Sequence, residues 1–193
     1  MGKAARIAQR IAALMGLLLL LGCGEQGWYG TDITGAMPPL RFFMARASDG
    51  ANVTANDYRG KLVVLYFGYT HCPDICPATL ANIGEALQKL GADAPRVSVL
   101  FVTVDPNRDT LPILKTYVKA FAPQMDALRG GDNAIADLAR RCRVAYSVTA
   151  GPPYQVMHSD AVFLFDPAGR ARIVTLSTDN TAALADDMKR LLE

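Results

Sequence analysis

The chain has 193 residues, of which 51% are hydrophobic and 20% charged, with four Cys, two His and a formal net charge of +2. This apolar content excludes a disordered chain, the length favours one domain, and four Cys are too few for a disulfide-stapled scaffold. Lys3, Arg6 and Arg10 lie near the start, and without them 17 basic residues stand against 18 acidic ones. No basic surface for nucleic acid is expected from that balance.

The first 22 residues have the pattern of an export signal. A basic stretch precedes the apolar run Ile11–Leu21, which is too short to cross a hydrocarbon core of about 30 Å as a comfortable helix. The run ends in Leu20-Leu21-Gly22-Cys23, which resembles the bacterial lipobox, where cleavage precedes a Cys that then carries lipid. We predict a signal peptide over residues 1–22 and lipidation of Cys23. The alternative is an uncleaved anchor with an incidental Cys.

Export would place the protein in the bacterial cell envelope, facing the periplasm, and acyl chains would hold it to a membrane. Lipidation of Cys23 leaves Cys72, Cys76 and Cys142 as thiols. Residues 23–39 contain four Gly and two Pro and show little apolar periodicity. This composition predicts a flexible tether, with the folded domain over residues 40–193.

Strand and helix patterns alternate in the predicted domain, which indicates an α/β fold. Leu62–Phe67 and Val97–Val104 are apolar on both faces and rich in β-branched residues, as expected for central strands of a covered, mostly parallel sheet. Ala161–Phe165 and Arg172–Leu176 flank a turn and predict a hairpin. Helical spacing of apolar residues predicts helices over 77–90, 110–121, 133–141 and 181–192.

Two cysteines stand where the first predicted strand meets the first predicted helix, in Cys72-Pro73-Asp74-Ile75-Cys76. Free backbone N–H groups and the positive end of a helix stabilise a thiolate there. If both cysteines lie on the first helical turn, the rise of 1.5 Å per residue places their Cα atoms about 6 Å apart, within disulfide range. The pair could therefore exchange disulfides or supply two soft ligands to a metal ion.

A metal ion held by two thiolates needs a further ligand, and His158 is the candidate. It stands just before the apolar strand Ala161–Phe165. Two thiolates and one imidazole, with no fourth Cys or His at a convenient spacing, favour Cu(I) over structural zinc, which takes four ligands. The alternative is a hydrogen-bonded His at the start of a strand, without a ligand role.

Several motifs between Leu40 and the C-terminus together resemble one family. In chain order they are Gly60-Lys61, Phe67-Gly68-Tyr69-Thr70, Cys72–Pro77, Val104–Thr110 and His158-Ser159. They resemble the Sco/SenC copper-binding proteins, which are thioredoxin-like domains involved in assembling the binuclear copper A centre of cytochrome c oxidase. The resemblance implies a thioredoxin-like α/β fold with a mixed, mostly parallel sheet. It also implies that Cys72, Cys76 and His158 are copper ligands.

This resemblance implies a membrane-tethered copper metallochaperone, carrying Cu(I), Cu(II) or both. The expected acceptor is the cytochrome c oxidase subunit that carries the copper A site, and a periplasmic copper donor and a thioredoxin-like reductant are further expected partners. The alternative is a thiol-disulfide reductase that keeps the acceptor's cysteines reduced, with Cys72 as the attacking thiol. A thiol peroxidase on the same fold is a third hypothesis.

Two aspartates near these motifs have both a functional and a structural interpretation. Asp105 follows the second predicted strand, where α/β sheets place their sites, and could orient a copper ligand or contact a partner. Its alternative role is to cap its own turn, with Arg108 and Asp109 as solvated ion partners. Asp74 could tune the charge of the copper site, or only favour the start of a helix.

Four other side chains could in principle take part. His71 could be an auxiliary ligand, but we expect a surface residue that modulates the thiol pKa. Cys142 falls at helical spacing with apolar residues, which predicts a buried, inert thiol. Met125 and Met157 could ligate copper, and we expect both to pack in the core instead.

Overall fold

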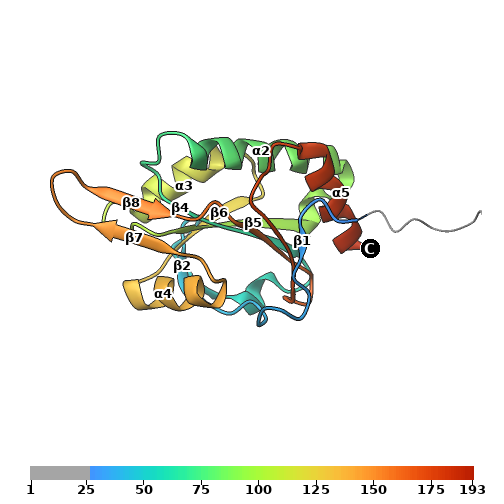
Figure 1. Cartoon of the computed structure of the whole chain (residues 1–193), viewed down its shortest axis with the longest axis horizontal. Coiled ribbons are helices and arrows are strands. Elements are labelled where there is room, and N and C mark those ends of the chain that lie inside the picture. Colours follow the sequence, from blue (N-terminus) through green and yellow to red (C-terminus); the bar gives the residue numbers. More distant parts are fainter. Residues whose placement is uncertain (1–26) are drawn as a thin grey trace, which may run out of the picture.

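The computed structural model describes residues 27–193, so the predicted signal peptide and Cys23 lie outside the described residues. A mixed sheet of eight strands forms the central layer, in the order β1-β10-β9-β4-β5-β6-β2-β3 (Figure 1). The three strands β4, β5 and β6 run parallel, and β9 is antiparallel to β4. The strands are β1 (Thr31–Asp32), β2 (Phe43–Arg46), β3 (Asn52–Thr54), β4 (Leu62–Gly68), β5 (Val97–Thr103), β6 (Met125–Arg129), β9 (Val162–Phe165) and β10 (Ala171–Thr175).

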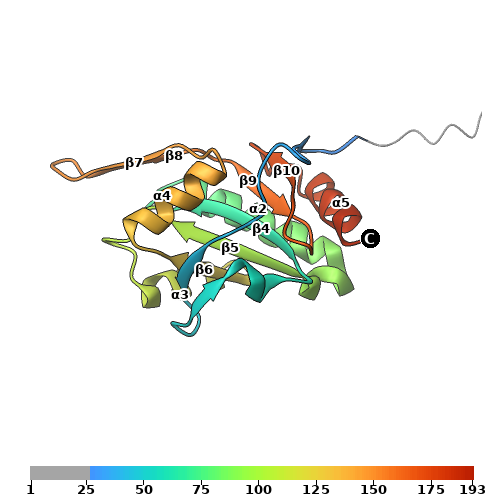
Figure 2. The same cartoon turned by 90° about the horizontal axis from the view of Figure 1, so that it is seen from below.

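Helices cover both faces of this sheet (Figures 1 and 2). On one face Leu62, Val64 and Tyr66 pack with α2, α3 and α5, and on the other Val63 and Leu65 pack with α4. All residues of β4 and β5 are buried, as the sequence predicts for central strands. None of the helices within residues 27–193 has the length and apolar character needed to cross a bilayer. The helices are α2 (Ile75–Leu90), α3 (Leu111–Lys119), α4 (Asp132–Arg141), α5 (Thr181–Leu192) and the short 3-10 segments η1 (Ala55–Tyr58) and η2 (Gly91–Arg96).

A second sheet, which the sequence does not predict, consists of two strands only. The strands β7 (Tyr146–Thr149) and β8 (Gln155–His158) pair antiparallel, with Tyr146 opposite His158. They are not paired with the eight-stranded sheet, and their hairpin projects from the body of the molecule (Figures 1 and 2). The four predicted helices, the two central strands and the β9–β10 hairpin are confirmed, with shifts at their ends.

The prediction of a flexible tether over residues 23–39 is wrong for its described part, residues 27–39. Strand β1 adds an edge to the sheet by pairing with β10. The backbone N–H groups of Tyr29 and Gly30 donate to the two carboxylate oxygens of Asp187 in α5, at 3.1 and 2.9 Å. The guanidinium of Arg190 lies 3.9 Å from the centre of the Trp28 ring. The ordered domain therefore begins before Leu40, because backbone and aromatic contacts compensate for the weak apolar pattern.

Candidate metal centre

The two cysteines lie on either side of the start of α2. The helix begins at Ile75, with Asp74 as its N-cap residue, so Cys76 lies in the first helical turn and Cys72 precedes the helix. The residue that precedes a proline is disfavoured in helical conformation, and Cys72 precedes Pro73. The sulfur of Cys72 still accepts a hydrogen bond from the backbone N–H of Cys76, at 3.4 Å. This N–H group belongs to the first helical turn, whose donors have no partner inside the helix.

The two thiols differ in their access to solvent. Cys76 is fully buried, whereas 9% of the Cys72 surface is exposed. Burial raises the pKa of the Cys76 thiol to about 12, because an apolar environment disfavours the charged thiolate. For this residue the cost of burial therefore exceeds the stabilisation that we expect from the helix end.

Gly68 gives the buried sulfur its space. A Cβ atom at this position would lie 2.9 Å from Cys76 Sγ and 2.6 Å from Cε2 of Phe101. Both distances are shorter than real Cβ contacts, so any larger residue must displace the thiol or the ring. The last residue of β4 thereby controls the position of the second cysteine.

His158 reaches the cysteines from the end of β8. Its Nε2 atom lies 3.2 Å from Cys76 Sγ, and its Nδ1 atom lies 3.0 Å from the carbonyl oxygen of Ser159. Since a carbonyl oxygen only accepts, Nδ1 carries the proton, which leaves the lone pair of Nε2 facing the sulfur. A backbone carbonyl on the second ring nitrogen is the usual support of a metal-binding histidine.

The predicted ligands Cys72, Cys76 and His158 thus come together, with their candidate ligand atoms all within 4.8 Å of one another. One metal ion placed between them can contact all three. Two soft thiolate sulfurs and one imidazole nitrogen suit copper and leave the tetrahedral set of a structural zinc site incomplete.

Two tyrosines enclose the imidazole. The ring centres of Tyr66 and Tyr69 lie 6.0 and 5.8 Å from that of His158, at interplanar angles of 75° and 85°. The buried hydroxyl of Tyr66 has no hydrogen-bond partner, and burial raises its pKa, with a further contribution from Cys76. The imidazole is therefore held edge to face between two rings, and an unused polar group stands beside the buried sulfur.

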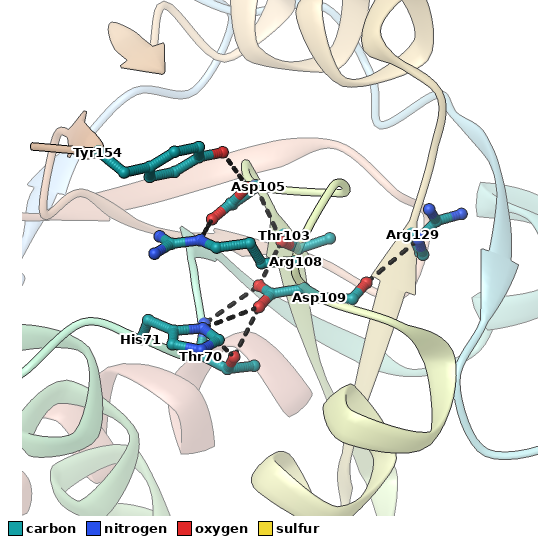
Figure 3. A network of polar contacts seen from close by, with 8 residues as sticks. All are labelled: Thr70, His71, Thr103, Asp105, Arg108, Asp109, Arg129 and Tyr154. Atoms are coloured by element: carbon teal, nitrogen blue, oxygen red, sulfur yellow. Dashed lines mark hydrogen bonds and ion pairs between the residues drawn. The ribbon is translucent and has the colours of Figure 1, made fainter. Parts of the chain in front are cut away.

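Asp109 holds the loop that leads to Cys72 (Figure 3). Its carboxylate is fully buried and accepts hydrogen bonds from the backbone N–H and the hydroxyl of Thr70, at 3.0 and 2.6 Å. The Thr103 hydroxyl at the end of β5 donates to the same carboxylate at 2.6 Å. The expectation that Asp109 is a solvated ion partner is therefore wrong, because three donors compensate for its burial.

A family comparison identifies the protein class to which this site belongs. The SCO1/SenC family profile matches residues 39–193. The chain belongs to the SCO1/SenC family. It is 43% identical over 138 residues to the mitochondrial SCO2 homolog of Bos taurus. The aligned region covers 64% of this chain and 51% of the relative. The chain thus spans about half the length of these mitochondrial SCO2 relatives.

Solved structures of Sco proteins share the fold. The copper-bound structure of Bradyrhizobium japonicum ScoI has 33% sequence identity and a TM-score of 0.72, and covers 79% of this chain and 98% of that protein. The solution structure of apo Sco1 from Thermus thermophilus has 32% identity and a TM-score of 0.77, and the match covers 87% of this chain and 99% of that protein. The predicted thioredoxin-like α/β fold is confirmed, and copper has been observed in a related Sco protein.

The remaining candidates of this SCO1/SenC chain lie outside the group of three ligands. Asp74 is exposed at the start of α2, without a side-chain capping hydrogen bond. His71 is half-exposed, and its Nδ1 atom lies 3.8 Å from the carboxylate of Asp109. Asp105 is fully buried, and its carboxylate accepts hydrogen bonds from Arg108 and Tyr154 rather than from the three ligands.

The other sulfur atoms divide between core and surface. Cys142 is buried beside Ile135 and Leu138, and burial raises its pKa to about 12, which confirms a core thiol. Met125 is fully buried, but Met157 is 68% exposed. The expectation that Met157 packs in the core is wrong, because it lies on the unpredicted projecting hairpin, where one face of each strand is exposed.

Proposed function

We propose that this chain is a copper metallochaperone that binds one copper ion through Cys72 Sγ, Cys76 Sγ and His158 Nε2. The observation that carries the proposal is the approach of these three atoms to within 4.8 Å from two separate parts of the fold. Copper binding by a related ScoI supports it. Copper is the cargo of this activity, so the site must release the ion as well as bind it.

The geometry of the site suits transfer. Loading requires both thiols to lose their protons, and the protonated Nδ1 of His158 keeps Nε2 available as the third donor. Three protein ligands leave copper open to a ligand from an acceptor. Cys72 is the more exposed of the two sulfurs, so an incoming ligand meets copper on that side, while Cys76 holds the ion from within. A disulfide between the two sulfurs would remove both thiolates and prevent loading.

The family resemblance supplies the proposed setting. The acceptor is the cytochrome c oxidase subunit with the copper A site, and a periplasmic donor and a thioredoxin-like reductant load and reduce the chaperone. The lipobox that ends at Cys23 supports a signal peptide and a lipid anchor, which would place the domain on the periplasmic side of a membrane in the bacterial envelope.

Copper competition tests the site. The reduced full chain is titrated with Cu(I) against a chromophoric chelator, together with Cys72→Ser, Cys76→Ser and His158→Ala. We expect one copper per wild-type chain and a large loss of affinity in each variant. Cys142→Ser is the matched control, because Cys142 is a buried thiol outside the group, and it should bind like the wild type. Unchanged affinity in His158→Ala would contradict the proposed ligand set.

A second candidate function, thiol-disulfide reduction, is favoured by the asymmetry of the pair. The sulfur of Cys72 is partly exposed and accepts a hydrogen bond from the backbone N–H of Cys76. Its thiolate would attack one sulfur of the acceptor's disulfide and release the other as a thiolate. Cys76 would then attack Cys72, which releases the reduced acceptor and leaves a disulfide in this chain. His158 has no role in these steps. Full reductase activity in a His158→Ala variant that still supports oxidase assembly would favour this function.

A further inference from the structure

The third ligand is carried by an element outside the eight-stranded sheet. The β7–β8 hairpin forms its own two-stranded sheet, and it extends away from the body in both views (Figures 1 and 2). Within the described residues, hydrogen bonds of two hairpin side chains join it to the body. In the first the Cys76 thiol donates to Nε2 of His158, and in the second the Tyr154 hydroxyl donates to Asp105. The second bond involves no ligand, so it can hold the hairpin in place before any metal arrives.

Tyr154 makes two kinds of contact with the loop that follows β5 (Figure 3). Its hydroxyl donates to Asp105 Oδ1 at 2.7 Å. The guanidinium carbon of Arg108 lies 4.0 Å from the centre of the Tyr154 ring, and its Nε atom donates to the other carboxylate oxygen of Asp105. A cation on a ring face and a hydrogen bond to a carboxylate are both attractive, and burial of Asp105 strengthens the second.

The same loop also reaches the cysteine side of the site. The backbone N–H of Asp105 donates to the Thr103 hydroxyl at 3.0 Å, and that hydroxyl donates to Asp109. Asp109 in turn accepts both hydrogen bonds from Thr70, two residues before Cys72. The loop after β5 therefore binds both sides of the site. Asp109 accepts hydrogen bonds from the segment that leads to Cys72, and Asp105 accepts one from the hairpin that carries His158.

We propose that Tyr154, Asp105 and Arg108 form a latch that positions His158 over the two cysteines. The latch residues touch neither copper nor the ligand atoms, so they are positioning residues. This inference rests on the proposed function for its effect on copper. A histidine that is already in place loses less freedom on metal binding, which raises affinity, chiefly by slowing dissociation.

Tyr154→Phe tests the latch, because it removes the hydroxyl and keeps the ring over Arg108. Tyr146→Phe is the matched control, since Tyr146 is a half-buried tyrosine on the same hairpin, and the hydroxyl that donates to Asp105 belongs to Tyr154. We expect copper to dissociate roughly tenfold faster from Tyr154→Phe, which corresponds to loss of one hydrogen bond to a charged group. The midpoint of thermal unfolding should stay near that of the wild type in both variants.

A second measurement needs no copper. In the reduced, copper-free full chain, amide hydrogen exchange over residues 146–158 should be faster in Tyr154→Phe than in Tyr146→Phe. Equal exchange in the two variants would overturn the latch, and faster exchange with an unchanged copper dissociation rate would overturn its role in positioning His158. Failure of the wild type to bind copper would instead contradict the proposed function, and the exchange data would still decide whether the latch exists.

Discussion

The two sides of the candidate metal centre are built very differently. The cysteine arm, residues 68–76, connects the fully buried strand β4 to the helix α2, whose inner face is buried in the core. The histidine arm, residues 146–158, is a hairpin in which half-buried and exposed residues alternate. Two ligands are therefore placed by the folding of the domain itself, and the third is placed by the docking of a small element onto it.

This difference predicts how the two arms respond to mutation. Changes in the cysteine arm should lower the free energy of unfolding together with copper affinity, because the same packing supports both. Changes in the histidine arm should affect copper and leave global stability almost unaltered, because the hairpin buries little of the core. The following four substitutions test this division, from the largest expected effect to the smallest.

Leu80→Ala should have the largest effect. Leu80 is fully buried in α2, one turn after Cys76, and removal of such a side chain costs about 2–5 kcal/mol because a cavity remains. Urea unfolding of the reduced chain measures this loss. Leu176→Ala is the control, since Leu176 is 76% exposed, and it should change the free energy of unfolding by less than about 0.5 kcal/mol. A loss of less than about 0.5 kcal/mol in Leu80→Ala would contradict the view that the core behind the cysteine arm determines the stability of the domain.

Gly68→Ala should cost about 1–3 kcal/mol of unfolding free energy, the usual range for overpacking a core. The added methyl group would push against Phe101 and Cys76, so copper affinity should fall in the same variant. Denaturant unfolding and Cu(I) competition give the two values. A stable Gly68→Ala variant with wild-type affinity would show that the cysteine arm adapts more easily than its packing suggests.

Tyr69→Leu measures the coupling between the arms, because Tyr69 belongs to the cysteine arm and its ring meets that of His158. Edge-to-face aromatic contacts contribute about 0.5–1.5 kcal/mol beyond the buried area. A double-mutant cycle with His158→Ala, scored by urea unfolding of the copper-free chain, should give a coupling energy of about 1 kcal/mol. Strict additivity would mean that the two arms are energetically independent without copper.

Met157→Ala should have the smallest effect. Met157 is largely exposed next to His158, and exposed substitutions away from special features change stability by less than about 0.5 kcal/mol. Copper stoichiometry and dissociation rate should match the wild type, because the thioether lies outside the group of three ligands. Loss of copper in this variant would add a fourth ligand to the site.

The sequence predicts the cysteine arm better than the histidine arm for a physical reason. Long apolar runs such as Leu62–Phe67 and the apolar spacing of α2 are local signals, and the structure confirms both elements. The segment around His158 contains Gly151, Pro152 and mixed polar residues, so it carries no clear periodicity. Its strands depend on pairing with each other, and their place in the fold depends on distant partners.

The latch illustrates what local patterns cannot show. Asp105 and Tyr154 are 49 positions apart, and nothing in either neighbourhood indicates that a tyrosine will meet a buried carboxylate. Likewise Asp109 resembles a surface residue in the sequence, and only the fold brings Thr70 and Thr103 to it. Ligand identity could be predicted from residue types and a family resemblance, whereas the residues that set ligand geometry required the structure.

The attachment of residues 27–32 to α5 and β10 also gives the molecule a direction. This segment lies at one end, and the β7–β8 hairpin projects from the other (Figures 1 and 2). Any group joined upstream of residue 27, whether a lipid or a further domain, is therefore attached at the end of the molecule opposite the hairpin. The attachment then contacts only the edge of the sheet and α5. The hairpin lies at the opposite end and stays accessible to a partner.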